Sequence, residues 1–172
     1  MVSRVIPVEP FDLVLFGATG DLAHRKILPG LFHRFVVGQI PPDAKVIGAA
    51  RTHQTPEQFR HSVAHSIRTH SAAPDEKALS EFLDRVEYVS LDAMGDAGWE
   101  DPKQFLRPNV VRAFYLSVGP NFFGPIASKL SEHGMATEAS RIVVEKPFGH
   151  DLASAKALNE DLRNCFEEYQ IY

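Results

Sequence analysis

The sequence has few of the features that mark membrane, disulfide-linked or metal-rich proteins. Its 172 residues include one cysteine, Cys165, which excludes an internal disulfide and any metal site built from several cysteines. No apolar run reaches the roughly 18 residues that a membrane-spanning helix needs. Residues 1–10 carry two prolines and no sustained apolar core, unlike a secretion signal. We therefore expect a soluble protein of the cytoplasm with no membrane partner.

An excess of charge of one sign is also missing. Lys and Arg number 18 against 22 Asp and Glu, a net charge of -4, and the basic residues are scattered rather than gathered in a stripe. We therefore expect no nucleic-acid partner. Apolar residues make up 44% and charged residues 23%, which is an ordinary globular mixture. The length suits a single domain over residues 1–172.

Short apolar runs alternate with segments of helical periodicity. We predict strands at residues 11–16, 45–50, 86–91, 110–118 and 141–145, and helices at residues 21–37, 56–69, 75–83, 122–130 and 152–166. Residues 93–108 mix Gly, Asp and Pro, which predicts a loop or short helical turns. The alternation indicates the α/β class: a Rossmann-type, doubly wound, mostly parallel sheet with helices on both faces.

A glycine-containing turn joins the first strand to the first helix. It reads Gly-Ala-Thr-Gly-Asp-Leu-Ala over residues 17–23. Gly17 permits a sharp exit from the strand, Gly20 lets a phosphate approach the backbone, and Ala23 is small enough for close helix packing. Amides at a helix start, aided by the helix dipole, bind pyrophosphate oxygens. On the glycines alone, an ordinary β-α turn is an equally good interpretation, and a P-loop is excluded because its Lys-Ser/Thr ending is missing.

The residue after the second predicted strand favours one coenzyme. NAD-binding proteins ordinarily end this strand with an acid that accepts from the adenosine ribose, whereas here Arg51 and Thr52 follow it. A guanidinium pairs with a 2′-phosphate, and the Thr52 hydroxyl adds a donor. We therefore predict NADP, with NAD as the alternative coenzyme, over a merely solvated surface arginine.

Taken together, these segments resemble the N-terminal coenzyme domain of glucose-6-phosphate dehydrogenase. The matching stretches are GATGDLAHRKILP at residues 17–29, IGAAR at 47–51, YVSLD at 88–92, FYLSVGP at 114–120 and IVVEKPFGHDL at 142–152. Their order and spacing span essentially the whole chain. The resemblance implies an enzyme of the pentose phosphate pathway that oxidises the C1 hydroxyl of glucose 6-phosphate to a lactone and reduces NADP or NAD.

The resemblance also implies roles for individual residues. The implied pyrophosphate-binding residues are Gly17, Ala18, Thr19, Gly20, Asp21 and Leu22. Arg51 becomes the partner of the 2′-phosphate, and Asp92 with Ala93 a wall of the coenzyme site. Lys146 would reach both coenzyme and substrate, and the bond between Lys146 and Pro147 is expected to be cis, as few X-Pro bonds are. Lys146 would also follow a parallel strand, at the sheet edge where open α/β sheets bind ligands.

No catalytic residue is expected in this chain. In the family, the histidine that acts as general base belongs to a later α+β domain, which also serves dimerisation. The eight histidines present are interpreted as surface or capping residues, and no metal site is expected, although His61 and His65 share a helical face. We therefore expect a chain that binds coenzyme without turnover, taken from an enzyme that forms a homo-oligomer.

A glycine-containing turn of this kind is compatible with two other classes of protein. A short-chain reductase or sugar-nucleotide epimerase needs a Tyr-x-x-x-Lys pair, and no tyrosine in this sequence is followed by lysine at that spacing. A non-catalytic Rossmann-fold nucleotide-binding or sensor module remains the alternative.

Overall fold

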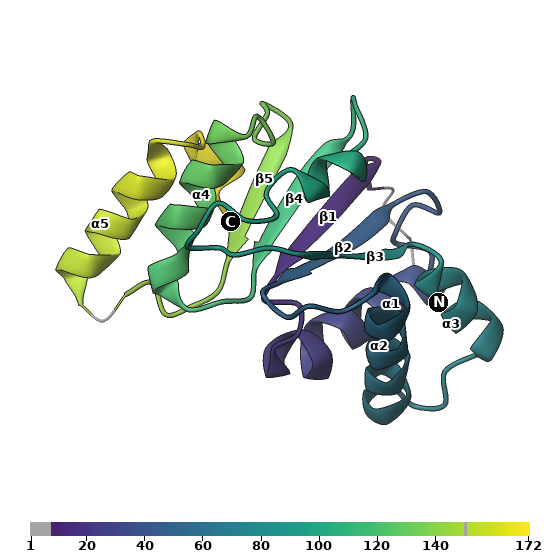
Figure 1. Cartoon of the computed structure of the whole chain (residues 1–172). Coiled ribbons are helices and arrows are strands. Elements are labelled where there is room, and N and C mark those ends of the chain that lie inside the picture. Colours follow the sequence, from purple (N-terminus) through teal and green to yellow (C-terminus); the bar gives the residue numbers. More distant parts are fainter. Residues whose placement is uncertain (1–7, 150) are drawn as a thin grey trace, which may run out of the picture.

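The computed structural model describes residues 8–149 and 151–172, so that most of the N-terminal segment and His150 lie outside it. Its centre is a five-stranded parallel sheet in the order β3-β2-β1-β4-β5. Figure 1 shows the strands in this order, with β5 at the left and β3 at the right. The strands are β1 (Phe11–Phe16), β2 (Lys45–Ala50), β3 (Val86–Ser90), β4 (Val111–Leu116) and β5 (Ser140–Val144).

Helices cover both faces of the sheet (Figure 1). They are η1 (Ala23–Ile27), α1 (Leu28–Val36), α2 (Pro56–His70), α3 (Glu76–Leu83), η2 (Asp101–Gln104), η3 (Pro120–Phe122), α4 (Phe123–Glu132), α5 (Leu152–Arg163) and η4 (Glu168–Gln170). Neighbouring side chains of a strand point to opposite faces. Thus Leu13 and Leu15 of β1 pack with α1, α2 and α3, whereas Val14 and Phe16 pack with α4 and α5. The predicted doubly wound Rossmann-type fold is confirmed.

The first helix is present, but its opening turns are widened. Asp21 and Leu22 are helical, and η1 is a π-helix in which the Leu28 N–H donates to the carbonyl of Ala23, five residues back. Pro29 has no N–H, and in a regular α-turn its ring would clash with the carbonyl four residues earlier. A π-turn gives that carbonyl more room. The irregularity of this helix therefore lies in the turn before Pro29.

Other predicted elements are present with shifted ends. β4 stops at Leu116, two residues before the predicted end, although the Ser117 N–H still donates to the Phe16 carbonyl of β1 at 3.0 Å. α5 ends at Arg163 rather than at residue 166. One pairing was not predicted: Ile171 forms a parallel bridge with Ile142 on the outer edge of β5. The Tyr172 N–H donates to the Ile142 carbonyl at 2.9 Å, so this segment covers part of that edge.

Asp12 is the one charged residue within the buried run of β1, and the fold satisfies it fully. Its side chain is inaccessible to solvent. The carboxylate accepts the backbone N–H of Arg107 at 2.8 Å and that of Lys45 at 3.3 Å, and it pairs with the Arg107 guanidinium at 2.8 Å. These bonds lie near the amino-terminal end of β1 and tie it to Lys45 and Arg107. The candidate binding site lies at the opposite, carboxyl-terminal edge of the sheet.

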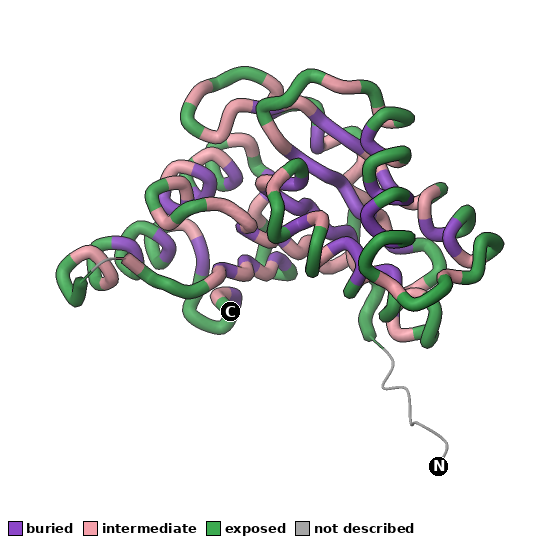
Figure 2. The backbone as a smooth tube through the Cα atoms, turned by 90° about the horizontal axis from the view of Figure 1, so that it is seen from below, coloured by how far each residue is buried: buried purple, intermediate pink, exposed green. Residues whose placement is uncertain are grey.

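Burial is concentrated in the strands and on the inner sides of the helices (Figure 2). None of the helices in the described part of the chain is both long and apolar enough to cross a membrane.

Candidate functional site

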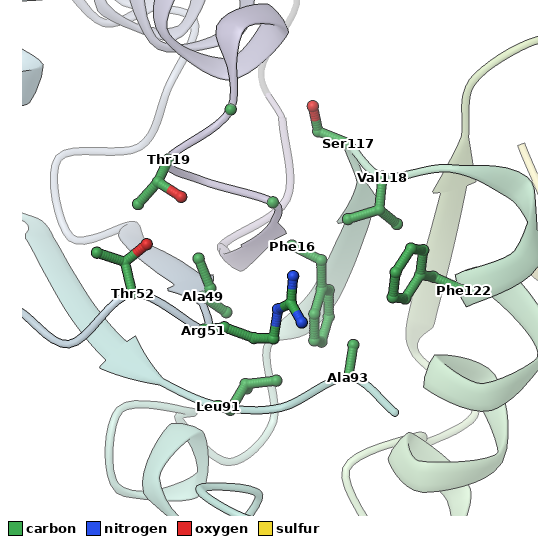
Figure 3. A pocket seen from close by; sticks show the side chains of 13 residues that line it. Phe16, Thr19, Ala49, Arg51, Thr52, Leu91, Ala93, Ser117, Val118 and Phe122 are labelled. Carbon is green, nitrogen blue, oxygen red and sulfur yellow. The ribbon is translucent and has the colours of Figure 1, made fainter. Parts of the chain in front are cut away.

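The order of the strands reverses direction in this sheet, and the point of reversal lies between the neighbouring strands β1 and β4. From β1 it proceeds outward through β2 to β3, and then returns to place β4 on the other side of β1. Open α/β sheets bind ligands at such a switch point, beyond the carboxyl ends of the strands. A pocket of about 510 Å³ lies there (Figure 3). Its lining residues are Phe16, Gly17, Thr19, Gly20, Ala49, Ala50, Arg51, Thr52, Leu91, Ala93, Ser117, Val118 and Phe122.

Gly17 lets the turn after β1 pass directly over the end of β4. Its φ of +75° lies in the left-handed region, and a Cβ atom here would lie 2.1 Å from the carbonyl oxygen of Ser117. The amides of Gly17 and Ala18 both donate to the Ala49 carbonyl, at 2.9 and 3.3 Å. The Gly20 amide donates to the Gly17 carbonyl at 2.9 Å. These three amides therefore shape the turn, and the Ala18 side chain is fully buried.

The same turn leaves other amides free. The backbone N–H groups of Thr19, Asp21 and Leu22 have no acceptor among the residues that the structure describes. They lie at the start of the helical segment that runs into η1, where the helix dipole adds a partial positive charge. This turn can therefore donate hydrogen bonds to an anionic ligand. Of the six residues predicted to bind pyrophosphate, these three carry the available donors.

Arg51 lies at the carboxyl end of β2 and points into the pocket from the side opposite Val118 and Phe122 (Figure 3). Within residues 8–149 and 151–172, its guanidinium forms no hydrogen bond or ion pair. Thr52 lines the same pocket beside it. An unpaired guanidinium at this position is available to a phosphate.

The two residues predicted after β3 play different parts. Ala93 lines the pocket together with Leu91. The Asp92 carboxylate accepts the Met94 N–H at 3.0 Å, and the Asp92 carbonyl accepts the indole N–H of Trp99 at 2.9 Å. Asp92 therefore shapes the turn, while its neighbours form the wall.

Lys146 adjoins this site through a second cavity of about 380 Å³. That cavity is lined on one side by Asp21 and Leu22 of the glycine turn and on the other by Lys146 and Pro147. The peptide bond between Lys146 and Pro147 is cis, as predicted. The fold thus brings Lys146 to the glycine turn, more than a hundred residues away in sequence.

The residue before Lys146 is anchored in the sheet. The Tyr115 hydroxyl of β4 donates to the Glu145 carboxylate. Burial of the phenol, together with this adjacent carboxylate, raises the pKa of Tyr115 to about 12. The bond holds the start of the Lys146 turn against β4.

Sequence reasoning missed Ser117. Ser117 lines both cavities. Its buried Oγ has no hydrogen-bond partner in the described part of the chain. Buried polar atoms are usually satisfied, so an orphan here fits a site that a polar ligand completes. One signal was available: Ser117 directly follows a strong apolar strand, at the edge where such sheets bind ligands.

No trio of His, Cys, Asp or Glu side chains among the described residues is placed to hold a metal ion. His24, His61 and His65 line a separate surface hollow between the start of the first helix and α2.

Comparison with known proteins agrees with this architecture. The family model described as glucose-6-phosphate dehydrogenase, NAD binding domain, matches residues 14–172. Glucose-6-phosphate 1-dehydrogenase of Rhizobium meliloti is 44% identical over 100% of this chain and 36% of its own length. The enzyme of that name from Gluconobacter oxydans is 40% identical over 96% of this chain and 35% of its own length.

Two solved structures are also similar. The crystal structure of glucose-6-phosphate 1-dehydrogenase from Mycobacterium avium has a TM-score of 0.88 and 29% identity over 95% of this chain and 35% of that one. A glucose-6-phosphate dehydrogenase in complex with its substrate has a TM-score of 0.83 and 34% identity over 100% of this chain and 37% of that one. The chain thus spans about a third of the length of these relatives. It belongs to the glucose-6-phosphate dehydrogenase family and comprises the family's N-terminal NAD-binding domain.

Proposed function

We propose that this chain is a single domain over its 172 residues, and that it binds NADP for a glucose-6-phosphate 1-dehydrogenase. The observation that carries the coenzyme choice is the Arg51 guanidinium, which has no partner in the described part of the chain and lies in the same pocket as the glycine turn. NADP differs from NAD by the 2′-phosphate on its adenosine ribose. A cation at the carboxyl end of β2 lies where that phosphate is bound in Rossmann folds.

The strength of this preference follows from the chemistry of the pair. A hydrogen bond to a charged group contributes about 1.5–3 kcal/mol, and each 1.4 kcal/mol is a factor of ten in affinity. Arg51 presents parallel donors that match a phosphate, and Thr52 adds a hydroxyl beside it. We therefore expect NADP to bind about 10- to 100-fold more tightly than NAD.

The residues predicted in the turn would hold the pyrophosphate. The amides of Thr19, Asp21 and Leu22, which have no acceptor among the described residues, supply the donors, and Gly17 and Gly20 let the phosphates approach the backbone. Ala93 and Asp92 would form and shape the wall beyond β3. When bound, the coenzyme supplies the nicotinamide ring that accepts hydride from C1 of the sugar.

Lys146 is the residue of this chain that we assign to the substrate as well as to the coenzyme. It is exposed and lines the cavity beside the glycine turn. An ammonium group there can hold a sugar hydroxyl or a phosphate by charge-assisted hydrogen bonds. Lys146 lies between the glycine turn and the end of β5. From there it would orient glucose 6-phosphate against the nicotinamide end of the coenzyme.

This chain alone is proposed to bind coenzyme without turnover. Oxidation of the hydroxyl requires a base within hydrogen-bond reach of its proton. None of the histidines that the structure describes lines the coenzyme pocket or the Lys146 cavity. We place the base, and the contacts of a homo-oligomer, in other parts of the whole enzyme. A cytoplasmic location, compatible with the single cysteine, completes the proposal.

Calorimetric titration with NADP and with NAD tests the coenzyme assignment. We expect Arg51→Ala to weaken NADP binding about 10- to 100-fold and to leave NAD binding nearly unchanged. Arg163→Ala is the matched control, because Arg163 lies on α5 and pairs with Glu168 away from the pocket. Equal losses in both variants would contradict the proposal. Binding of neither dinucleotide would favour a sensor module, and NADPH formation from glucose 6-phosphate by this chain would disprove the claim of no turnover.

A further inference from the structure

The backbone on both sides of Arg51 is tied to β3 by one side chain. The Tyr88 hydroxyl donates to the Thr52 carbonyl at 2.6 Å and lies 3.4 Å from the Ala50 carbonyl. The Leu91 N–H adds a bond to the Ala50 carbonyl at 3.0 Å. Tyr88 therefore spans Arg51 without touching its guanidinium.

A second, weaker tie holds the Arg51 backbone itself. The Ser90 Oγ donates to the Arg51 carbonyl at 3.4 Å and lies 3.1 Å from Nδ1 of His53. Tyr88 and Ser90 are two residues apart in β3, so their side chains lie on the same face of the strand. Together they hold the segment that runs from Ala50, the last paired residue of β2, to His53.

Tyr88 is a rigid donor. It is 5% exposed, and its ring packs against Phe59 with the ring centroids 4.8 Å apart. Phe59 is itself fully buried, and its ring leaves no room for a side chain at Gly48 of β2. A phenol is already protonated at neutral pH, and burial raises the pKa of Tyr88 further. The ring cannot move without disturbing the sheet beneath the pocket.

The Arg51 side chain needs such support because it has none of its own. Its guanidinium is without a partner in residues 8–149 and 151–172, so only the backbone that carries it restricts where it lies. A flexible backbone would have to be ordered when a phosphate binds, and this ordering lowers affinity. A fastened backbone removes the backbone share of that loss for the ligand that Arg51 contacts.

We propose that Tyr88, assisted by Ser90, is a positioning residue that sets the preference for NADP over NAD by holding the Arg51 backbone in place. The inference rests on the proposed function, since it requires that Arg51 bind the 2′-phosphate. Its consequence is specific. Loss of the Tyr88 hydroxyl reduces affinity for the dinucleotide that carries this phosphate and has little effect on the one that lacks it.

The test measures the dissociation constants of NADP and NAD for four chains: unmodified, Tyr88→Phe, Arg51→Ala and the double variant. Tyr88→Phe keeps the ring and removes the hydroxyl. We expect it to lower the NADP-to-NAD selectivity about three- to tenfold, the effect of one hydrogen bond. In the Arg51→Ala background the same substitution should leave selectivity unchanged, because Tyr88 acts through Arg51. Tyr169→Phe, at an exposed tyrosine, is the control for the substitution.

The outcomes separate the two proposals. If the unmodified chain does not prefer NADP, the proposed function fails. If the preference depends on Arg51 but survives in a folded Tyr88→Phe variant, the inference about Tyr88 alone is overturned. An equal loss with and without Arg51 also overturns it, since the substitution would then act on the whole pocket. Should Tyr88→Phe fail to fold, Ser90→Ala decides the matter: a smaller loss of selectivity supports the inference, and no loss rejects it.

Discussion

The turn at Gly17 offers the sharpest test of how the site is built, because the chain contains its own control. Gly17 and Gly38 have nearly the same backbone conformation, with φ of +75° and +72°. Alanine in this left-handed region costs about 1–2 kcal/mol at either position. The two glycines differ in their surroundings. Nothing lies within 4 Å of a Cβ built at Gly38, whereas the one at Gly17 meets the Ser117 carbonyl oxygen at 2.1 Å.

This difference sets the expected magnitudes. Gly38→Ala should lower the free energy of unfolding by about 1–2 kcal/mol, from the conformational cost alone. Gly17→Ala must in addition push the turn away from the end of β4, and overpacking of this kind costs about 1–3 kcal/mol more. We therefore expect a loss of about 2–5 kcal/mol for Gly17→Ala. For a chain of this length, each kcal/mol lowers Tm by about 2–4 °C.

Urea unfolding followed by tryptophan fluorescence measures the loss. Trp99 is 1% exposed and packs against Phe16, so unfolding moves it from the core into water. Titration of the folded variants with NADP adds a second measure: Gly17→Ala should weaken binding and Gly38→Ala should not. Equal losses of stability, or equal affinities for NADP, would refute the reasoning that close passage over β4 is what requires glycine at position 17.

Further predictions concern buried polar groups. Asp12→Asn removes the buried carboxylate that accepts the Arg107 side chain and two backbone N–H groups, but the Arg107 guanidinium keeps its pair with Asp43. We therefore expect a loss of about 1–3 kcal/mol in the free energy of unfolding. Glu76→Gln, in an exposed pair, should have little effect, and similar losses in urea unfolding would contradict this. Tyr115 has a pKa of about 12 against an ordinary value of 10.0, so its contribution to stability is complete below about pH 10 and is lost as the pH rises toward 12. Tyr115→Phe should therefore lower Tm near neutral pH, through the lost bond to Glu145, and flatten the alkaline decline of Tm. An unchanged decline in thermal melts between about pH 8 and about pH 11 would count against it.

Local pattern was enough to determine much of this protein. Strands and helices bury one face or both, so apolar spacing along the chain reports them directly. The turn from Gly17 to Leu22 and the arginine after β2 could be interpreted because their chemistry depends on neighbours in sequence. Family resemblance added Lys146 and the cis bond to Pro147, which spacing alone would have left as a surface turn.

The ends of elements were harder to predict, because they depend on what the chain meets in space. β4 stops early because the segment carrying Ser117 must pass the glycine turn. The first helix opens with a π-turn because Pro29 lies one turn further on. The pairing of Ile171 with β5 has no local signal at all, since an edge strand accepts a partner from any part of the chain.

The tertiary structure alone decided which groups are free to act. Every amide in the turn looks alike in sequence, yet those of Gly17 and Ala18 are taken by Ala49 while that of Thr19 remains available. Likewise, sequence placed an arginine after β2, but the structure shows that its guanidinium points into the pocket without a partner among the described residues. Hydrogen-bond partners come from distant strands, and the order of those strands is settled only when the sheet assembles.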